Sequence, residues 1–289
     1  MIRLVSIVYS FLLLIVVSAC HKESASPNAR TEATNPETSA PNTSNPNNNI
    51  VETQPAIVTP RVASISANVH GYGEALPALY DSTTKNYPLI VFLHGQGDVG
   101  NGSTDIYKVG REGIGKMVKN KTFPASFNSQ GKNYSFIVLL PQFDKWGEPG
   151  DVSLMIDYAI KNYRVDQSRI YVVGFSMGGG VTWLAGATYA SKIAAIVPIS
   201  SASMINDKNA EALATSKMPV WAFHNIEDTM VSVSYTKTNV SKVEALNPAV
   251  KPRLTLFTSQ AHDAWNKACN PGYKENNMNI YEWLLQYTR

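Results

Sequence analysis

The feature that most constrains the fold of this chain is a regular alternation between short apolar runs and segments with helical spacing. The apolar runs cover residues 87–95, 134–142, 169–176, 193–200, 218–225 and 253–260. The helical segments cover residues 110–120, 151–163, 177–190, 232–247 and 278–288. Buried strands separated by helices form a mostly parallel sheet that is covered on both faces. The pattern therefore predicts an α/β fold, and Asp151 is the expected N-cap of its helical segment.

A serine between two glycines follows one of these apolar runs. The sequence Gly174-Phe175-Ser176-Met177-Gly178 has the G-x-S-x-G pattern of a nucleophile elbow, placed between a predicted strand and a predicted helix. Small residues at 174 and 178 are needed because such a turn brings neighbouring backbone close. The alternative is an ordinary glycine-rich turn. The position between strand and helix favours Ser176 as a catalytic nucleophile.

A nucleophilic serine needs a base, and the chain has five histidines. His262 follows the last apolar run, so we expect it to be the base. In the chain order serine, acid, histidine, the acid lies between residues 176 and 262. Asp228, in the stretch "HNIEDTMV" after the run 218–225, is the expected acid. The less favoured acids are Glu227, Asp207 and Asp263.

Two main-chain N–H groups are expected to bind the oxyanion of the reaction. One is that of Met177, directly after the serine. The other is assigned to Gln96, in the glycine-containing turn His94-Gly95-Gln96-Gly97-Asp98. His94 is expected to support this turn rather than to take part in chemistry.

The stretches "VFLHGQGD", "GFSMGGG", "HNIEDTMV" and "AHDAW" together resemble the esterase branch of the α/β-hydrolases. They are similar to carboxylesterases, dienelactone hydrolases, feruloyl and acetylxylan esterases and polyhydroxybutyrate-depolymerase-like proteins. The resemblance covers nearly all of residues 61–289. It implies an α/β-hydrolase fold with the nucleophile, acid, base and oxyanion donors assigned above. Asn225 stands where the family often has glycine, and no long lid insertion is visible, so we expect an open site without a large cap domain.

The amino-terminal region has a different character. Residues 1–20 have Arg3, a mostly apolar run and small residues, the layout of a secretory signal. Their end, Val17-Ser18-Ala19-Cys20, resembles the lipobox of bacterial lipoproteins, which implies lipidation of Cys20; a plain signal peptide is the alternative. We expect an exported lipoprotein of the outer membrane, on its periplasmic or cell-surface side.

Residues 21–60 are predicted to be a flexible tether. Asn, Pro, Ser and Thr make up 23 of these 40 positions, and no Phe, Tyr or Trp occurs there. Such a segment cannot bury enough apolar surface to offset the entropy of ordering it. Residues 61–289 are then the catalytic domain, and Cys269 within it is an expected buried, inert thiol.

The sequence also limits what the protein binds. No metal-binding motif or phosphate-binding loop occurs, so no metal or other cofactor is expected. A net charge of +3 without a basic stripe gives no reason to expect nucleic acid. Trp146 and Trp265 lie near the predicted site and could stack on a substrate, or pack the loops instead. The expected function is hydrolysis of acetyl or feruloyl esters of polysaccharides; the alternatives are a peptidase, a polyester depolymerase or a silent glycan-binding module.

Overall fold

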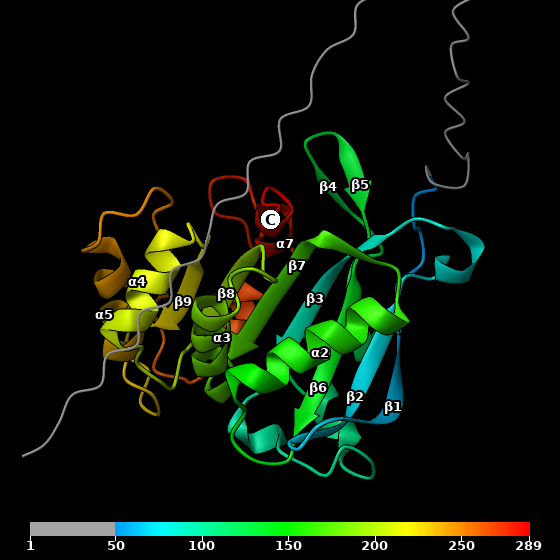
Figure 1. The fold of residues 1–289 in the computed structure, drawn as a ribbon, viewed down its shortest axis with the longest axis horizontal. Helices are drawn as coiled ribbons and strands as arrows, with labels where there is room; N and C mark the ends of the chain where they lie inside the picture. The colour runs from blue at the N-terminus through cyan, green and yellow to red at the C-terminus, as the bar shows by residue number, and fades with distance from the viewer. Residues whose placement is uncertain (1–49) are drawn as a thin grey trace, which may run out of the picture. The chain divides into compact units, whose positions relative to one another are not determined.

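The computed structural model describes residues 50–289, which fold around an eight-stranded sheet (Figure 1). The strand order is β1-β2-β6-β3-β7-β8-β9-β10. The strands are β1 (Ile57–Ser66), β2 (Val69–Leu76), β3 (Tyr87–Leu93), β6 (Ile137–Phe143), β7 (Val165–Phe175), β8 (Ala195–Ile199), β9 (Trp221–Asn225) and β10 (Arg253–Phe257). A separate small hairpin pairs β4 (Phe127–Ser129) with β5 (Lys132–Tyr134).

Seven α-helices connect or follow these strands in the part of the chain that the structure describes. They are α1 (Gly113–Lys119), α2 (Pro149–Asn162), α3 (Met177–Thr188), α4 (Asp207–Thr215), α5 (Ser234–Glu244), α6 (Ala264–Ala268) and α7 (Ile280–Leu284). Short 3-10 helices occur at Tyr80–Ser82, Gln96–Asp98 and Ile106–Gly110. The first two strands pair antiparallel, β2 pairs antiparallel with β6, and from β6 to β10 the pairing is parallel. The carboxyl ends of β3, β7, β9 and β10 therefore share one edge of the sheet.

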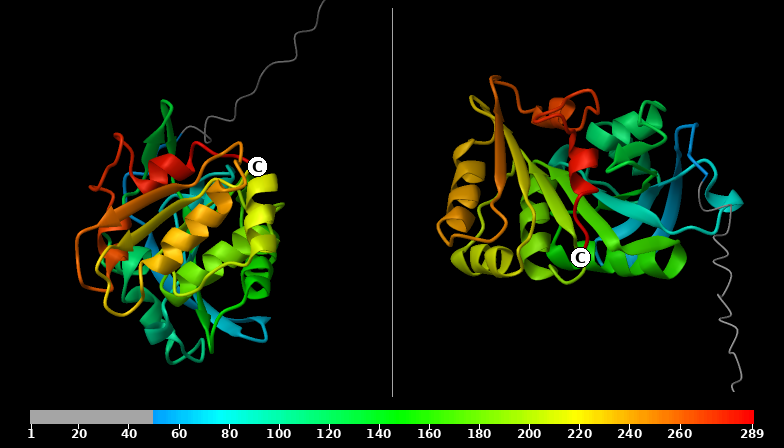
Figure 2. Two further views of the ribbon diagram at one scale, coloured as in Figure 1. Left: turned by 90° about the vertical axis from the view of Figure 1, so that its left-hand side faces the viewer. Right: turned by 90° about the horizontal axis from the view of Figure 1, so that it is seen from above.

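Side chains on the central strands alternate between two cores. On β3, Leu89, Val91 and Leu93 belong to one buried cluster, whereas Ile90 and Phe92 belong to the other. This alternation follows from the pleat of a strand, which sends successive side chains to opposite faces. Helices α2, α3, α4 and α5 supply the first cluster, and α1, α6 and α7 supply the second. Figure 2 shows the two helical layers on opposite sides of the sheet. The predicted α/β class with both faces covered is confirmed.

The pairing between β8 and β9 is the sparsest in the parallel part of the sheet. Its register consists of Ile199 opposite Phe223, with an isolated bridge between Ile196 and Val220. By contrast, β9 and β10 pair along their full lengths, from Trp221 opposite Arg253 to Asn225 opposite Phe257. The strands β9 and β10 thus form a well-paired unit at one edge.

The folded region begins before residue 61, contrary to the predicted boundary. Strand β1 starts at Ile57, inside the segment assigned to the tether, and the Glu52 side chain is buried against the domain. The Glu52 carboxylate accepts a hydrogen bond from Leu79 N at 2.9 Å. Sequence patterns missed β1 because it is an exposed edge strand containing Pro60, without an apolar run. The predicted signal segment, Cys20 and the remainder of the tether up to residue 49 lie outside the described residues.

The prediction that Asp151 is an N-cap is wrong. Helix α2 begins two residues earlier, at Pro149, with Glu148 as its N-cap. Proline suits this first position because its fixed φ is helical and its missing N–H has no intrahelical acceptor there. Asp151 is instead the third helical residue, and its carboxylate accepts hydrogen bonds from Ser66 Oγ (2.6 Å) and Asn68 Nδ2 (2.8 Å). It therefore ties α2 to the turn between β1 and β2.

Cys269 is buried, as expected, and its thiol is free. Burial raises the pKa of this thiol to about 12. In residues 50–289, no helix combines the length and apolar character needed to span a bilayer.

Candidate active site

Ser176 lies at a sharp turn between β7 and α3. Its backbone has φ 54° and ψ −117°, outside the regions that serine normally adopts. The flanking glycines are required by close backbone approach. A Cβ on Gly174 would lie 2.5 Å from Gly178 O, and a Cβ on Gly178 would lie 2.3 Å from Leu93 O. The turn therefore has the geometry expected of a nucleophile elbow, and it projects the serine at the carboxyl edge of the sheet.

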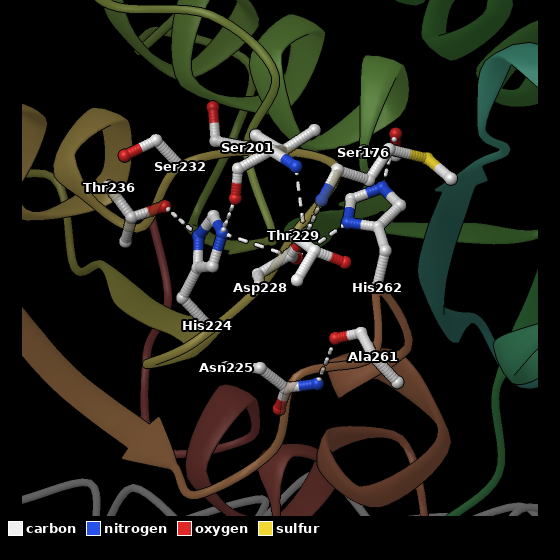
Figure 3. A network of polar contacts seen from close by, with 12 residues as sticks. Ser176, Ser201, His224, Asn225, Asp228, Thr229, Ser232, Thr236, Ala261 and His262 are labelled. Atoms are coloured by element: carbon white, nitrogen blue, oxygen red, sulfur yellow. Dashed lines mark hydrogen bonds and ion pairs between the residues drawn. The ribbon is translucent and has the colours of Figure 1, made fainter.

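Three side chains from three loops form one hydrogen-bonded chain (Figure 3). Ser176 Oγ donates to His262 Nε2 at 2.9 Å, and His262 Nδ1 donates to Asp228 Oδ2 at 2.6 Å. Because a carboxylate only accepts, this arrangement places the imidazole proton on Nδ1 and leaves Nε2 as an acceptor. His262 can then take the serine proton. The structure brings together the three residues that the sequence analysis selected.

The Asp228 carboxylate is held from every side. Its Oδ1 accepts the main-chain N–H groups of Met230 and Val231, both at 2.9 Å, and its side chain is fully buried. His224 Nε2 lies 3.5 Å from Oδ2 and donates instead to Val231 O at 3.0 Å. Thr236 Oγ1 lies 2.7 Å from His224 Nδ1. Burial lowers the pKa of His224, which favours its neutral form beside Asp228.

The alternative acids are placed elsewhere. Glu227 is exposed, Asp207 pairs with Lys242 at 2.7 Å, and Asp263 accepts a hydrogen bond from Asn225 Nδ2 at 2.8 Å. Asn225, where the sequence departs from the family pattern, ends β9 and has no positive φ. Its amide also donates to Ala261 O at 2.7 Å. It therefore ties the acid-bearing loop to the histidine-bearing loop, which a glycine could not do (Figure 3).

The predicted oxyanion donors lie on two turns, Gln96 after β3 and Met177 after β7. Gln96 begins a 3-10 helix and Met177 begins α3, positions whose N–H groups have no intrahelical acceptor. His94 Nδ1 lies 2.7 Å from Gly95 O, and Phe143 N donates to His94 Nε2 at 2.9 Å. Because Gly95 O and Gln96 N belong to one planar peptide unit, His94 fixes the direction of the Gln96 N–H.

His94 is itself held neutral. It is buried, and burial lowers its pKa to about 4. Gln142, fully buried at the end of β6, fixes the other side of the same turn. Its amide donates to Asp98 O at 2.9 Å and its carbonyl accepts from Gly102 N at 2.9 Å. The support that the sequence analysis expected from His94 is confirmed, whereas Gln142 carried no sequence signal.

A cavity of about 520 Å³ opens in front of Ser176. Trp146 lines it and is 45% exposed, so its ring is available to a ligand. Trp265 also lines it but is only 7% exposed, and its indole N–H donates to Glu112 Oε2 at 3.1 Å. The Trp265 ring packs edge-on against His262, with centroids 5.0 Å apart. Of the two tryptophans, Trp146 faces the open cavity, and Trp265 packs behind the base.

The cavity also has a polar wall that the sequence analysis did not assign. Asp98, Arg111 and Glu112 line it beside Gln96. Asp98 lies in the turn His94-Gly95-Gln96-Gly97-Asp98, and its position shortly after a buried strand could have indicated a site residue. Arg111 and Glu112 lie in the loop before α1, where no pattern marked them. Within the described residues, no group of three or more His, Cys, Asp or Glu side chains is placed to hold a metal ion.

Part of this chain is similar in sequence to known esterases. A sequence model of the phospholipase/carboxylesterase family matches residues 149–271, which include Ser176, Asp228 and His262. The bifunctional acetylxylan esterase/xylanase XynS20E of Neocallimastix patriciarum is 26% identical over 210 residues, covering 68% of this chain and 26% of that protein. The chain spans about a quarter of the length of the curated relatives it matches.

Solved structures give the same fold. A thermostable esterase superposes with a TM-score of 0.57 and 22% identity, covering 83% of this chain and 64% of that one. The ferulic acid esterase AmCE1/Fae1A of Anaeromyces mucronatus, solved with ferulic acid, gives a TM-score of 0.52 and 15% identity, covering 74% and 86%. The chain therefore has the α/β-hydrolase fold, and its residues 149–271 are similar to the phospholipase/carboxylesterase family.

Proposed function

We propose that this protein is a serine hydrolase of carboxylic esters that works through an acyl-enzyme. The observation that carries the proposal is the chain of hydrogen bonds from Ser176 through His262 to Asp228, at the tip of a strained turn that faces an open cavity. Ser176 Oγ attacks the ester carbonyl while His262 Nε2 takes its proton. Asp228 holds the imidazole in the required tautomer and stabilises the imidazolium.

The negative oxygen of the tetrahedral intermediate is bound by the N–H groups of Gln96 and Met177. Its collapse expels the alcohol, which takes the proton from His262. Water then enters, gives a proton to His262 and attacks the acyl carbonyl. When this second tetrahedral intermediate collapses, the acid is released and Ser176 Oγ takes the proton back from His262. His262 accepts and returns the proton in both halves of this reaction.

Acetyl or feruloyl esters of polysaccharides are the proposed substrates. Support comes from the names of the relatives, an acetylxylan esterase/xylanase and a ferulic acid esterase, and from the open cavity edged by Trp146. Polymer-linked esters need such an open site. We further propose export and a lipid anchor on Cys20, which fit a substrate outside the cell; these rest on the amino-terminal sequence alone.

The test is hydrolysis of p-nitrophenyl acetate and butyrate by the purified protein beside Ser176→Ala. The proposal expects turnover by the wild type and loss of essentially all of it in the variant, with unchanged circular dichroism. A fluorophosphonate should label the wild type and not the variant. Ser201→Ala, a change at a serine on the neighbouring loop, is the matched control and should keep both properties.

Two other results would redirect the assignment. Faster cleavage of peptide p-nitroanilides than of any ester would favour the peptidase alternative. A folded protein that neither cleaves esters nor reacts with fluorophosphonate would contradict the hydrolase proposal, and glycan binding would become the better account.

A further inference from the structure

Asp98 stands apart from the other buried carboxylates of this site. It lines the cavity with Ser176, two residues after Gln96, and its side chain is 8% exposed. Within residues 50–289 its carboxylate accepts no hydrogen bond. The closest cation is Arg111, whose Nη1 lies 3.7 Å from Oδ1, beyond hydrogen-bonding distance. Its carboxylate oxygens are not among the fully buried unpaired side-chain atoms of the described residues, so they open to the cavity and are available to a ligand.

Main-chain hydrogen bonds hold Asp98 in its place in the cavity wall. Asp98 N donates to Gly95 O at 3.1 Å, and Asp98 O accepts the Gln142 amide at 2.9 Å. The turn is therefore fixed at this residue from both sides. Burial raises the pKa of the Asp98 carboxyl to about 6, and Arg111 partly offsets this effect. The free protein thus keeps a carboxylate in an unfavourable place.

The charges around Asp98 limit what could bind there. A cationic ligand would approach the Arg111 guanidinium as well as Asp98. An anionic ligand would approach Asp98 and Glu112, which lines the same wall. A neutral group that both donates and accepts avoids both conflicts. A hydroxyl does so, because it can donate to the carboxylate and accept from the guanidinium.

We propose that Asp98 and Arg111 form a subsite for a hydroxyl group of the ester substrate. This inference rests on the proposed ester hydrolysis and deepens it, because it restricts the substrates to hydroxylated esters. The hydroxyl belongs either to a sugar on the alcohol side or to a phenol on the acyl side. Esters without hydroxyls make no such contact with Asp98 and Arg111.

Matched pairs of substrates test the subsite. One pair is methyl 4-hydroxycinnamate and methyl 4-methoxycinnamate, in which the phenol is present or blocked. The other is a mono-O-acetylated methyl xyloside and cyclohexyl acetate. A hydrogen bond to a charged group corresponds to about 10- to 100-fold in kcat/KM. The wild type should show a preference of this size within at least one pair, and that pair identifies which side carries the hydroxyl.

Variants then assign the preference to Asp98. Asp98→Ala removes the acceptor and should bring the ratio of kcat/KM within the pair close to one. Asp98→Asn keeps one acceptor oxygen without its charge and should keep part of the preference. Asp144→Asn is the matched control, since its carboxylate also lies beside a basic side chain, 3.6 Å from His70 Nε2, but does not line the cavity. It should leave the ratio unchanged.

The outcomes separate this inference from the function on which it rests. Turnover of p-nitrophenyl acetate with no hydroxyl preference in either pair would overturn the subsite alone. So would a preference that Asp98→Ala leaves intact. A wild type that turns over no ester would overturn the proposed function together with the subsite. A thermal melting temperature measured for each variant shows whether a lost preference accompanies a lost fold.

Discussion

The loop after β9 and the turn after β3 each carry a buried aspartate, Asp228 hydrogen-bonded to His262 and Asp98 in the cavity wall, and the two carboxylates have opposite surroundings. Asp228 accepts hydrogen bonds from Met230 N, Val231 N and His262 Nδ1. Asp98 accepts none within the described residues, although its main chain is fixed on both sides. A fully bonded carboxylate is already arranged for its task, whereas an unbonded one is positioned at the expense of stability.

The difference gives a way to distinguish two roles without knowing the substrate. A group that acts on other protein atoms has its partners in the free protein. A group that acts on a ligand lacks them until the ligand arrives. Substitution should therefore cost activity at Asp228 and raise stability at Asp98.

The largest expected effect is that of Asp228→Asn. The asparagine amide favours the wrong imidazole tautomer, so His262 can no longer accept the serine proton, and kcat for p-nitrophenyl acetate should fall by about 10⁴-fold. Glu227→Gln, at the exposed neighbour, is the control and should change kcat by less than about twofold. A loss below about tenfold in Asp228→Asn would mean that the acid lies elsewhere.

A smaller loss of kcat is expected from His94→Ala, which tests the role of the turn after β3. Without the imidazole, the Gly95–Gln96 peptide loses its fixed direction, and one oxyanion donor is misplaced. We expect kcat to fall by about 10²-fold, with a smaller change in KM. His70→Ala serves as the control because His70 is only partly buried and does not line the cavity. Equal losses in the two variants would argue against a positioning role for His94.

The smallest effect is on stability and has a defined pH dependence. Asp98→Asn should raise the free energy of unfolding by about 1 kcal/mol at neutral pH, because it removes a charge that burial makes unfavourable. In the folded protein the pKa of Asp98 is raised from 3.8 to about 6, so the folded state holds this proton more tightly than the unfolded state. The contribution of Asp98 to the free energy of unfolding of the wild type is therefore present at low pH. It is lost as the pH rises from 3.8 through about 6.

The gain from Asp98→Asn should accordingly be near zero below about pH 4 and complete above about pH 7. Urea denaturation of both proteins across this range measures it. A stabilisation that does not vary with pH would show that the charge of Asp98 is not its cause.

Much of the fold could be predicted because its central strands are buried on both faces. Runs such as 87–95 are almost entirely apolar, which is typical of a central strand in a parallel sheet. The strands β1 and β2 escaped detection because one is exposed and the other contains Gly71 and Gly73. Their position is decided by the pairing of β2 with β6, a contact between distant parts of the chain that local pattern does not record.

The candidate site, like the fold, has one part with a local sequence signature and one part without. The turn around Ser176 has a local signature, and the order of the chain then restricted the acid and the base. The hydrogen bonds of Asn225 and Gln142 had no local signature, because they depend on which loops meet in three dimensions. Trp265 illustrates the limit: its place beside His262 was apparent in the sequence, but its burial against Glu112 was not.

The sparse pairing between β8 and β9 has a consequence for how this protein loses activity. Ser176 follows the central strand β7, whereas Asp228 and His262 follow β9 and β10, on the other side of this sparse pairing, which we call the seam. Subglobal opening along the seam would part the nucleophile from its base while the central strands keep their hydrogen bonds. Loss of catalysis would then mark the opening of the β8–β9 boundary. In hydrogen exchange, the amides of β9 and β10 would exchange before those of β3 and β7, and activity would be lost when β9 and β10 open.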